Sequence, residues 1–261
     1  MDKKEKQTGK STWKIIFIAS VAVFLAALIS LICVLAPSLF SPAPKDVVET
    51  PSQIGTQTSS QVELIDNPID FAAQQAINPD IYAWIQIPGT TVDYPVLQSN
   101  DDKPEDFYLN HDVNEKYKFA GCIYSQRLNS KDFNDPNTIL YGHNMNNGSM
   151  FASLHKFRNA QFFNENKYIY IYTPGHILTY TIYAAYRYDN RHILYAFDLN
   201  NKEIFAEYIE MTKSPKSTIV NVRNDVEVTA EDKIITLSTC ITNDNYRYLV
   251  QGVLTSDQPT K

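Results

Sequence analysis

The last third of the chain contains two runs in which apolar and polar residues alternate, as they do along β-strands. In residues 233–240, the polar side chains of Thr236, Ser238 and Cys240 share one face, and Ile235, Leu237 and Thr239 share the other. Residues 246–254 alternate in the same way, with Arg247 at the start. A short connection joins the runs, so an antiparallel hairpin would bring Cys240 and Arg247 opposite each other, about 5 Å apart at Cβ. The pattern therefore predicts a thiol facing a guanidinium on a polar strand face, as in a reactive centre.

Six further runs have the length and composition of strands. They lie at residues 81–87, 91–96, 121–124, 138–141, 167–172 and 178–187. Residues 173–176, Thr-Pro-Gly-His, predict a hairpin turn. Eight short strands separated by turn residues predict a mostly-β fold built as an eight-stranded barrel.

Three segments predict helices instead. Asn67 is expected to cap a helix that has Pro68 at its first position and ends before Asn78-Pro79. Residues 201–213 repeat apolar side chains at helical spacing, which predicts a helix inserted before the cysteine-bearing strand. A smaller helix is expected at residues 150–157.

The first 61 residues differ from the rest. Residues 1–14 carry five lysines and two acidic residues, and residues 15–35 are 21 uncharged, mostly apolar residues. As a helix that run would be about 31 Å long, enough to cross a bilayer. The lysines before it predict a single-pass protein of the cell membrane with its N-terminus in the cytoplasm. Residues 36–61, rich in Pro, Ser and Thr, predict an extracytoplasmic linker to a domain at 62–261.

A cleaved signal peptide is the alternative for this segment. Ser41-Pro42-Ala43 offers small residues for cleavage. The apolar run is nevertheless longer than the 7 to 15 residues, roughly, that are typical of a signal peptide. An uncleaved anchor is therefore the favoured interpretation.

Charge and cysteine content narrow the functional classes. The net charge is −6, and beyond residue 14 the chain has 18 basic and 27 acidic residues, or −9. No basic patch indicates nucleic-acid binding. Three cysteines cannot build a disulfide framework: Cys33 lies in the apolar N-terminal run and Cys122 in a buried-looking strand, which leaves Cys240 as the reactive thiol. Because no residues have metal-ligand spacing, neither a metal nor a cofactor is expected.

A nucleophilic cysteine needs a proton partner, usually a histidine. The apolar run at 138–141 ends at Gly142 and presents His143 in a polar loop, where it could reach a cleft. From the local pattern alone, His143 is either that partner or an ordinary loop histidine. The other four histidines have hydrophilic neighbours and are expected on the surface: His111, His155, His176 and His192.

Three sequence blocks together resemble the class B sortases, a family of cysteine transpeptidases on Gram-positive cell surfaces. The blocks are Trp84 to Gln98; Tyr141 to Met145 followed by Gly148 to Phe151; and Thr236 to Cys240 with Arg247. The resemblance extends from about Asn67 to Leu254. It implies a sortase-type barrel outside the membrane, with an N-terminal helix and a helix inserted before the cysteine-bearing strand.

The resemblance also implies a reaction. Cys240 would attack a threonine carbonyl in the C-terminal sorting signal of a secreted protein, Arg247 would bind the developing oxyanion, and His143 would transfer protons. An amine of the peptidoglycan precursor or of a pilin would then accept the protein. Four residues are implied to line the substrate groove, with plain barrel packing as the alternative for each: Leu97, Ser238, Ile193 and Tyr195.

The chain departs from the family pattern in one place. Many class B members carry an acidic residue two positions after the cysteine, and here that residue is Thr242, with Asp244 as the nearest acidic replacement. The connection after Cys240 is also short for the family. Two other functions stay open at this point: a thiol peptidase that only hydrolyses, and a tethered binding or scaffold protein without turnover.

Overall fold

The computed structural model describes residues 64–241 and 245–261. Within these two ranges, no helix is long and apolar enough to cross a membrane. The tail, membrane span and linker expected at residues 1–61 lie outside the described residues, as do Thr242 and Asp244.

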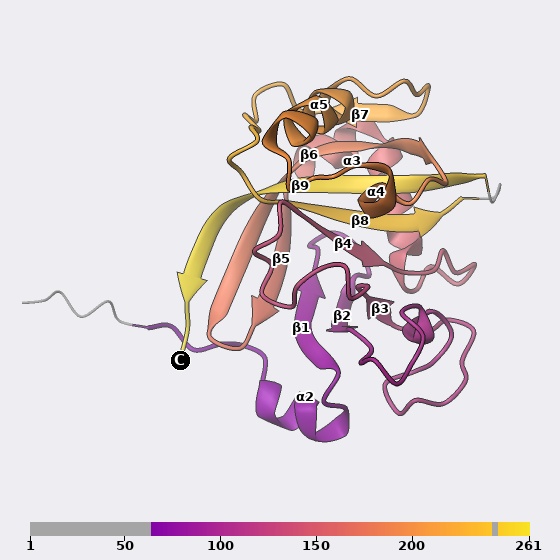
Figure 1. The fold of residues 1–261 in the computed structure, drawn as a ribbon, viewed down its shortest axis with the longest axis vertical. Coiled ribbons are helices and arrows are strands. Elements are labelled where there is room, and N and C mark those ends of the chain that lie inside the picture. Colours follow the sequence, from indigo (N-terminus) through magenta and orange to yellow (C-terminus); the bar gives the residue numbers. More distant parts are fainter. Residues whose placement is uncertain (1–63, 242–244) are drawn as a thin grey trace, which may run out of the picture. The chain divides into compact units, whose positions relative to one another are not determined.

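Eight strands close into a barrel in the order β5-β1-β2-β3-β4-β8-β9-β6, and β6 pairs back with β5 (Figure 1). The strands are β1 (Ile81–Gln86), β2 (Asp93–Leu97), β3 (Ile123–Tyr124), β4 (Asn137–Tyr141), β5 (Tyr168–Thr173), β6 (His176–Asp189), β8 (Ile234–Cys240) and β9 (Tyr246–Pro259). Each predicted strand run overlaps one of them, so the mostly-β, eight-stranded barrel is confirmed.

One further strand was not predicted. β7 (Val220–Val222) pairs with the second half of β6, at Ala184–Tyr186, and so extends the sheet beyond the barrel. Three residues are too few for an alternation pattern to be recognised.

The helices lie between and around the strands. They are α2 (Phe71–Ile77), the 3₁₀ helices Phe107–Leu109 and Phe151–Arg158, α3 (Ala160–Glu165), α4 (Ile193–Ala196) and α5 (Lys202–Lys213). α5 confirms the helix expected before the cysteine-bearing strand, and Asn201 caps it by accepting hydrogen bonds from the backbone amides of Glu203 and Ile204. The turn at residues 173–176 is also as predicted, because Thr173 pairs with His176.

The predicted start of the first helix was wrong. Asp70, and not Asn67, is the N-cap of α2, and its side chain accepts a hydrogen bond from the Ala73 amide at 3.0 Å. Asn67 instead donates to the Thr173 carbonyl and to the Thr260 hydroxyl, 2.9 and 3.1 Å away. The Asn67 side chain therefore ties the segment before α2 to the barrel.

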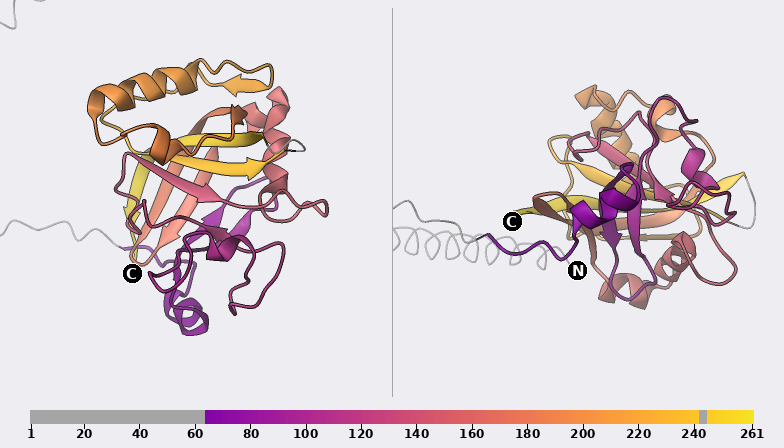
Figure 2. Two further views of the ribbon diagram at one scale, coloured as in Figure 1. Left: turned by 45° about the vertical axis from the view of Figure 1, so that its right-hand side comes forward. Right: turned by 90° about the horizontal axis from the view of Figure 1, so that it is seen from below.

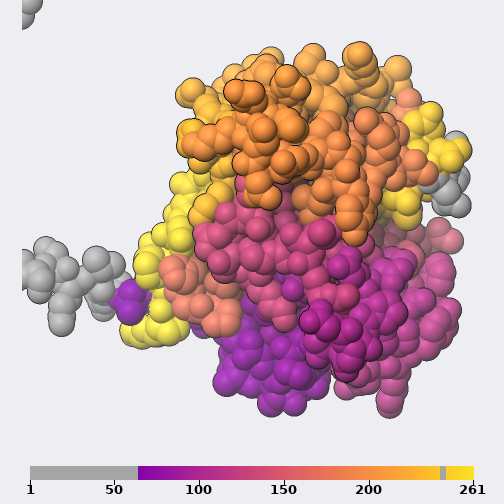
Figure 3. All heavy atoms as spheres, in the orientation of Figure 1, coloured from indigo at the N-terminus to yellow at the C-terminus, as the bar shows by residue number. Residues whose placement is uncertain are grey.

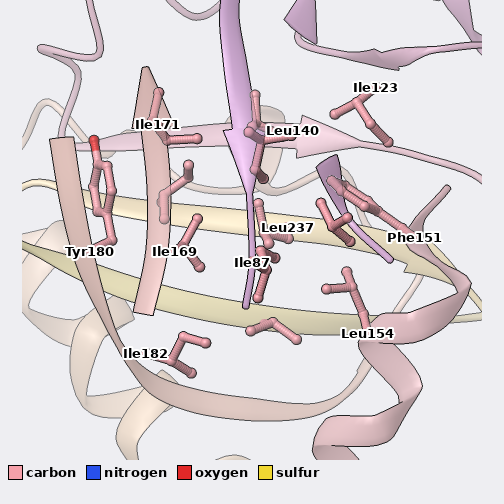
Figure 4. Packing of buried hydrophobic residues seen from close by; sticks show 14 of the residues in the cluster. Ile87, Ile123, Leu140, Phe151, Leu154, Ile169, Ile171, Tyr180, Ile182 and Leu237 are labelled. Atoms are coloured by element: carbon pink, nitrogen blue, oxygen red, sulfur yellow. The ribbon is translucent and has the colours of Figure 1, made fainter. Parts of the chain in front are cut away.

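The barrel interior is filled by apolar side chains from all around the sheet (Figure 4). Ile235 and Leu237 of β8 belong to this core, whereas the alternate residue Thr236 faces the other way. Because alternation places Thr236, Ser238 and Cys240 on one face, that face is the outer surface of the barrel.

The outer face of β8 and β9 is covered by the insertion that carries α4 and α5, which lies over these strands in Figures 1 and 2 and forms one end of the domain in Figure 3. Gln251 of β9 donates hydrogen bonds to the Tyr208 hydroxyl of α5 and to the Thr236 hydroxyl of β8, both at 2.9 Å. Strand β8 is therefore buried from Ile234 to Thr239 and becomes partly exposed only at Cys240. The insertion therefore leaves uncovered only the end of β8 that carries Cys240, the candidate nucleophile.

Candidate active site

The hairpin predicted from alternation is present. β8 and β9 pair antiparallel, and Cys240 is the register partner of Arg247. On its other side, Arg247 is paired with Tyr188 of β6. The guanidinium donates a hydrogen bond to the Tyr246 carbonyl at 3.0 Å. The cysteine and arginine are therefore set opposite each other by the sheet itself.

His143 is brought to the same end of β8 by a parallel pairing. Tyr141 of β4 is the partner of Ser238, and the Gly142 amide donates to the Ser238 carbonyl at 3.2 Å. His143 and Cys240 each lie two residues beyond the paired Tyr141 and Ser238. Because parallel neighbours run side by side, the two chain segments carry the imidazole and the thiol to one edge of the sheet.

Gly142 is required at the exit of β4. A Cβ atom at this position would lie 2.5 Å from Cδ1 of Ile123 and 2.8 Å from Cδ2 of Phe151. Any side chain would therefore have to displace these two buried side chains or the strand end that carries His143.

Cys240, His143 and Arg247 line one cavity of about 300 Å³. Ser238 and Ile193, which the resemblance placed in the substrate groove, line it as well, and both are mostly buried, with exposed fractions of 7% and 4%. The α4 segment that carries Ile193 lies beside β8 (Figure 2).

The structure does not bring the other two predicted groove residues to the cavity. Leu97 is fully buried and packs with Ile81 and Tyr108 in a small separate core. Tyr195 is 71% exposed, does not line the cavity, and lies against His192, with ring centroids 4.4 Å apart and the ring planes tilted by 40°. Leu97 therefore serves barrel packing, which was the alternative interpretation.

The environment of His143 favours its neutral form. Burial lowers its pKa below the usual value, and a hydrogen bond to the backbone of Leu109 opposes that effect. The ring also stacks on Phe119, with centroids 5.0 Å apart and 22° between the planes.

Two tyrosines form the wall beside the thiol. Tyr124 and Tyr141 stack with centroids 5.5 Å apart, and both line the cavity. Burial raises the pKa of each phenol, and the nearby Arg247 guanidinium acts in the opposite direction on both. These phenols are therefore neutral hydrogen-bonding groups rather than bases.

The prediction that the other histidines lie on the surface was wrong for three of them. Only His176 is exposed, and its Nδ1 lies 2.6 Å from Oδ1 of Asp257. His111 is half-buried and stacks on Phe107. His192 is half-buried too; it lines the cavity, with Nε2 2.6 Å from Oε1 of Gln126. Hydrophilic neighbours in sequence do not reveal that a loop folds back over the barrel.

His155 lies directly behind the candidate nucleophile. Its Nε2 is 3.1 Å from the Cys240 carbonyl oxygen, and burial lowers its pKa. Its Nδ1 is buried and has no hydrogen-bond partner among the residues that the structure describes. Nothing in the local sequence indicated this contact, because it depends on the 3₁₀ helix 151–158 packing against the end of β8.

The second described cysteine has no part in this site. Cys122 is buried, as predicted, and burial raises the pKa of its thiol to about 12. In the described part of the chain, no three histidine, cysteine or carboxylate side chains gather as a metal-binding group. The chemistry available in the cavity is therefore that of a thiol, an imidazole and a guanidinium, which together suit acyl transfer.

Comparison with known proteins points to the same chemistry. The family model described as Sortase domain matches residues 85–255. Sortase B of Listeria monocytogenes is 35% identical over 185 residues, which cover 69% of this chain and 72% of the relative.

Two solved structures have a similar fold. Sortase B of Clostridium perfringens is 34% identical, with a TM-score of 0.64, and the match covers 71% of this chain and 100% of that one. A complex of Staphylococcus aureus sortase B with substrate is 30% identical, with a TM-score of 0.63 over 71% of this chain and 84% of that one.

Proposed function

This chain belongs to the sortase family as a cysteine transpeptidase of the sortase B type, and we propose that it cleaves a C-terminal sorting signal after a threonine and transfers the protein to an amine. The observation that carries this proposal is the pairing of Cys240 with Arg247 across a hairpin, at the edge of a cavity that His143 also lines. Each of the three groups has a distinct task in acyl transfer.

The first half of the reaction forms a thioester. Neutral His143 takes the proton of the Cys240 thiol, the resulting thiolate attacks the threonine carbonyl carbon, and Arg247 stabilises the oxyanion with its planar donor fork. The carbon–nitrogen bond then breaks, and the His143 imidazolium gives its proton to the departing amine. The N-terminal part of the substrate stays on the sulfur.

The second half reverses the proton transfer. An incoming amine gives a proton to neutral His143 and attacks the thioester carbon, which releases the Cys240 thiolate and forms a new amide. A solved sortase B is complexed with triglycine. This supports a small peptide amine as acceptor, and we propose an amine of the peptidoglycan precursor, with a pilin amine as the second candidate.

The cavity supports a substrate path along the outer face of β8. Ser238 shares the Cys240 face of the strand, and Ile193 contributes an apolar surface from α4. We propose that both contact the sorting signal, with the exposed Tyr195 nearby on α4 as a less direct contributor. Leu97 is not proposed as a contact of the sorting signal, because its side chain is enclosed in the core.

We propose further that the enzyme acts outside the cell membrane. Residues 15–35 would form a single-pass anchor with the N-terminus in the cytoplasm, and residues 36–61 would hold the catalytic domain above the bilayer. Secreted proteins that carry a sorting signal would meet the enzyme there.

A peptide panel tests the function. Peptides with NPxTN-, LPxTG- and SPxTG-like signals would be incubated with the chain, with and without triglycine, and the products separated by mass. We expect one signal to give a cleaved product without the amine and a ligated product with it, and Cys240→Ala to give neither.

The same assay separates the two other functions. A hydrolytic thiol peptidase would yield cleaved product that does not shift to ligated product when the amine is added. A binding or scaffold protein would hold the peptide without cleaving it. Either result would overturn the proposed transpeptidation.

A further inference from the structure

We propose that Phe119 is a positioning residue of the reaction, whose exposed ring stacks on the imidazole of His143 and fixes its orientation in the cavity. This inference rests on the proposed role of His143 as the proton-transfer group. Phe119 itself is not among the residues that line the cavity, so it acts through His143 rather than on the substrate.

The contact has the geometry of an aromatic stack. The two ring centroids are 5.0 Å apart and the planes are 22° from parallel. Aromatic pairs are favourable at centroid separations of about 4.5 to 7 Å. The imidazole of His143 thus has one face covered by the phenyl ring.

Core packing does not explain the place of Phe119. Its side chain is 64% exposed, and it belongs to none of the apolar clusters of the domain. An exposed phenyl ring gains little from burial where it stands. Its ring contact among the described residues is His143, which gives the exposed aromatic a specific task.

The backbone around Phe119 is held in place on both sides. The Lys118 amide donates to the Asn110 carbonyl at 2.9 Å, and the Gly121 amide donates to the Lys118 carbonyl at 2.8 Å. Gly121 has φ of +56°, and a Cβ there would lie 2.2 Å from the Leu109 carbonyl oxygen, so only glycine allows this close approach. The turn that carries Phe119 therefore has one defined position.

A second contact to His143 comes from Leu109, at the end of the 3₁₀ helix Phe107–Leu109 that the Phe119 turn packs against. The backbone of Leu109 forms a hydrogen bond with the imidazole, and Gly121 packs against that same peptide group. The stack limits rotation of the ring, and the Leu109 backbone offers the ring one hydrogen-bond partner. Together they restrict His143 to one orientation before substrate arrives, which is how positioning raises the rate of proton transfer.

Three variants of the full chain test this proposal. Phe119→Leu keeps an apolar side chain and removes the ring, whereas Phe119→Tyr keeps the ring. Tyr117→Leu is the matched control, because Tyr117 is also exposed, at 73%, and its ring contacts His111 rather than His143. For each variant, kcat and KM of amine transfer would be measured along with the NMR signals of the His143 ring protons.

We expect Phe119→Leu to lower kcat about 3- to 10-fold, because loss of one aromatic stack reduces the fraction of His143 rings in the productive orientation by about that factor. KM should stay within about twofold of the wild-type value. The His143 ring protons should move downfield, because they lose the shielding of the phenyl face. Phe119→Tyr should retain both the rate and the shifts, and Tyr117→Leu should change neither.

The contact can also be tested without substitution, by a nuclear Overhauser effect between the two rings in the wild-type chain. If this effect is absent, or if Phe119→Leu leaves the His143 shifts unchanged, the stack is wrong. If the shifts move and kcat does not fall, the positioning role is wrong. A wild-type chain that shows the stack but transfers no peptide would instead overturn the proposed function.

Discussion

His155 Nε2 lies 3.1 Å from the backbone carbonyl oxygen of Cys240. The imidazole also packs against Tyr248, with ring centroids 5.1 Å apart. The hydrogen bond is made at the last residue of β8, where the strand leaves its buried face and the connection to β9 begins. The nucleophile is therefore supported from behind by the helix 151–158 and from the side by the strand of Arg247.

Replacing His155 with alanine should destabilise this end of the strand. The Cys240 carbonyl would lose its donor in a partly buried position, at a cost of about 1–3 kcal/mol. Urea unfolding measures the free energy of unfolding, and kcat should fall in parallel because the thiol loses its support. His155→Gln offers a donor again and is the control. Equal stability of the alanine variant and the wild type would show that the contact has no structural role.

Arg247→Lys should impair catalysis severely while leaving the fold intact. A lysine keeps the charge but loses the planar fork, so oxyanion stabilisation should fall and kcat should drop about 10²- to 10³-fold. Arg187→Lys is the matched control, because the Arg187 guanidinium lies 4.7 Å from the centre of the Tyr246 ring and does not line the cavity. Initial rates of peptide ligation by the two variants and the wild type measure this loss. A lysine variant as active as the wild type would remove Arg247 from the mechanism.

Stability should fall as the solution is acidified from pH 7.5 to 5.5. His143, His155 and His192 all have pKa values lowered by burial, so the unfolded chain takes up protons at a higher pH than the folded chain does. Above about pH 7 the three are neutral in both states and contribute nothing. Below the unfolded value of about 6.5, the unfolded state binds more protons and the free energy of unfolding decreases.

Urea unfolding at pH 7.5, 6.5 and 5.5 checks this dependence. His155→Gln removes one of the three groups, so the decrease on acidification should become smaller in that variant. A free energy of unfolding that stays constant or rises toward pH 5.5 would contradict the assignment of these histidines as neutral buried groups.

Gly142→Ala should disturb the site through packing alone. The added methyl group would overlap Ile123 and Phe151, and overpacking of this kind costs about 1–3 kcal/mol. The strand end should shift and move His143, so amine transfer should slow as well. Gly148→Asn is a suitable control in the same loop, because no atom lies within 4 Å of its Cβ position and asparagine tolerates the positive φ of 79°. Thermal or urea unfolding of the two variants gives the comparison.

The sequence predicts the central part of the site because that part follows from the period of a strand. Alternation together with the short connection between the two runs places Cys240 opposite Arg247, and the structure has that register. The exit of an apolar run at Gly142 likewise places His143 at a strand end. The barrel follows from the same signal repeated along the chain.

What the sequence cannot predict depends on how distant segments pack. Leu97 sits in a strand near the site, yet its side chain points into a core that no local pattern reveals. His155 and Phe119 contact the site only because a 3₁₀ helix and a glycine turn fold against it. The helix start moves from Asn67 to Asp70 because the Asn67 side chain is engaged by Thr173 and Thr260.

The most direct test is to trap the acyl group on the enzyme. The chain would be mixed with its preferred signal peptide in the absence of amine, quenched in acid, and analysed by intact mass and peptide mapping. We predict an increase in mass equal to the peptide up to its threonine less one water, located on Cys240 and discharged to ligated product when triglycine is added before the quench. Ligated product formed by Cys240→Ala, or an adduct mapped to any other residue, would contradict the account.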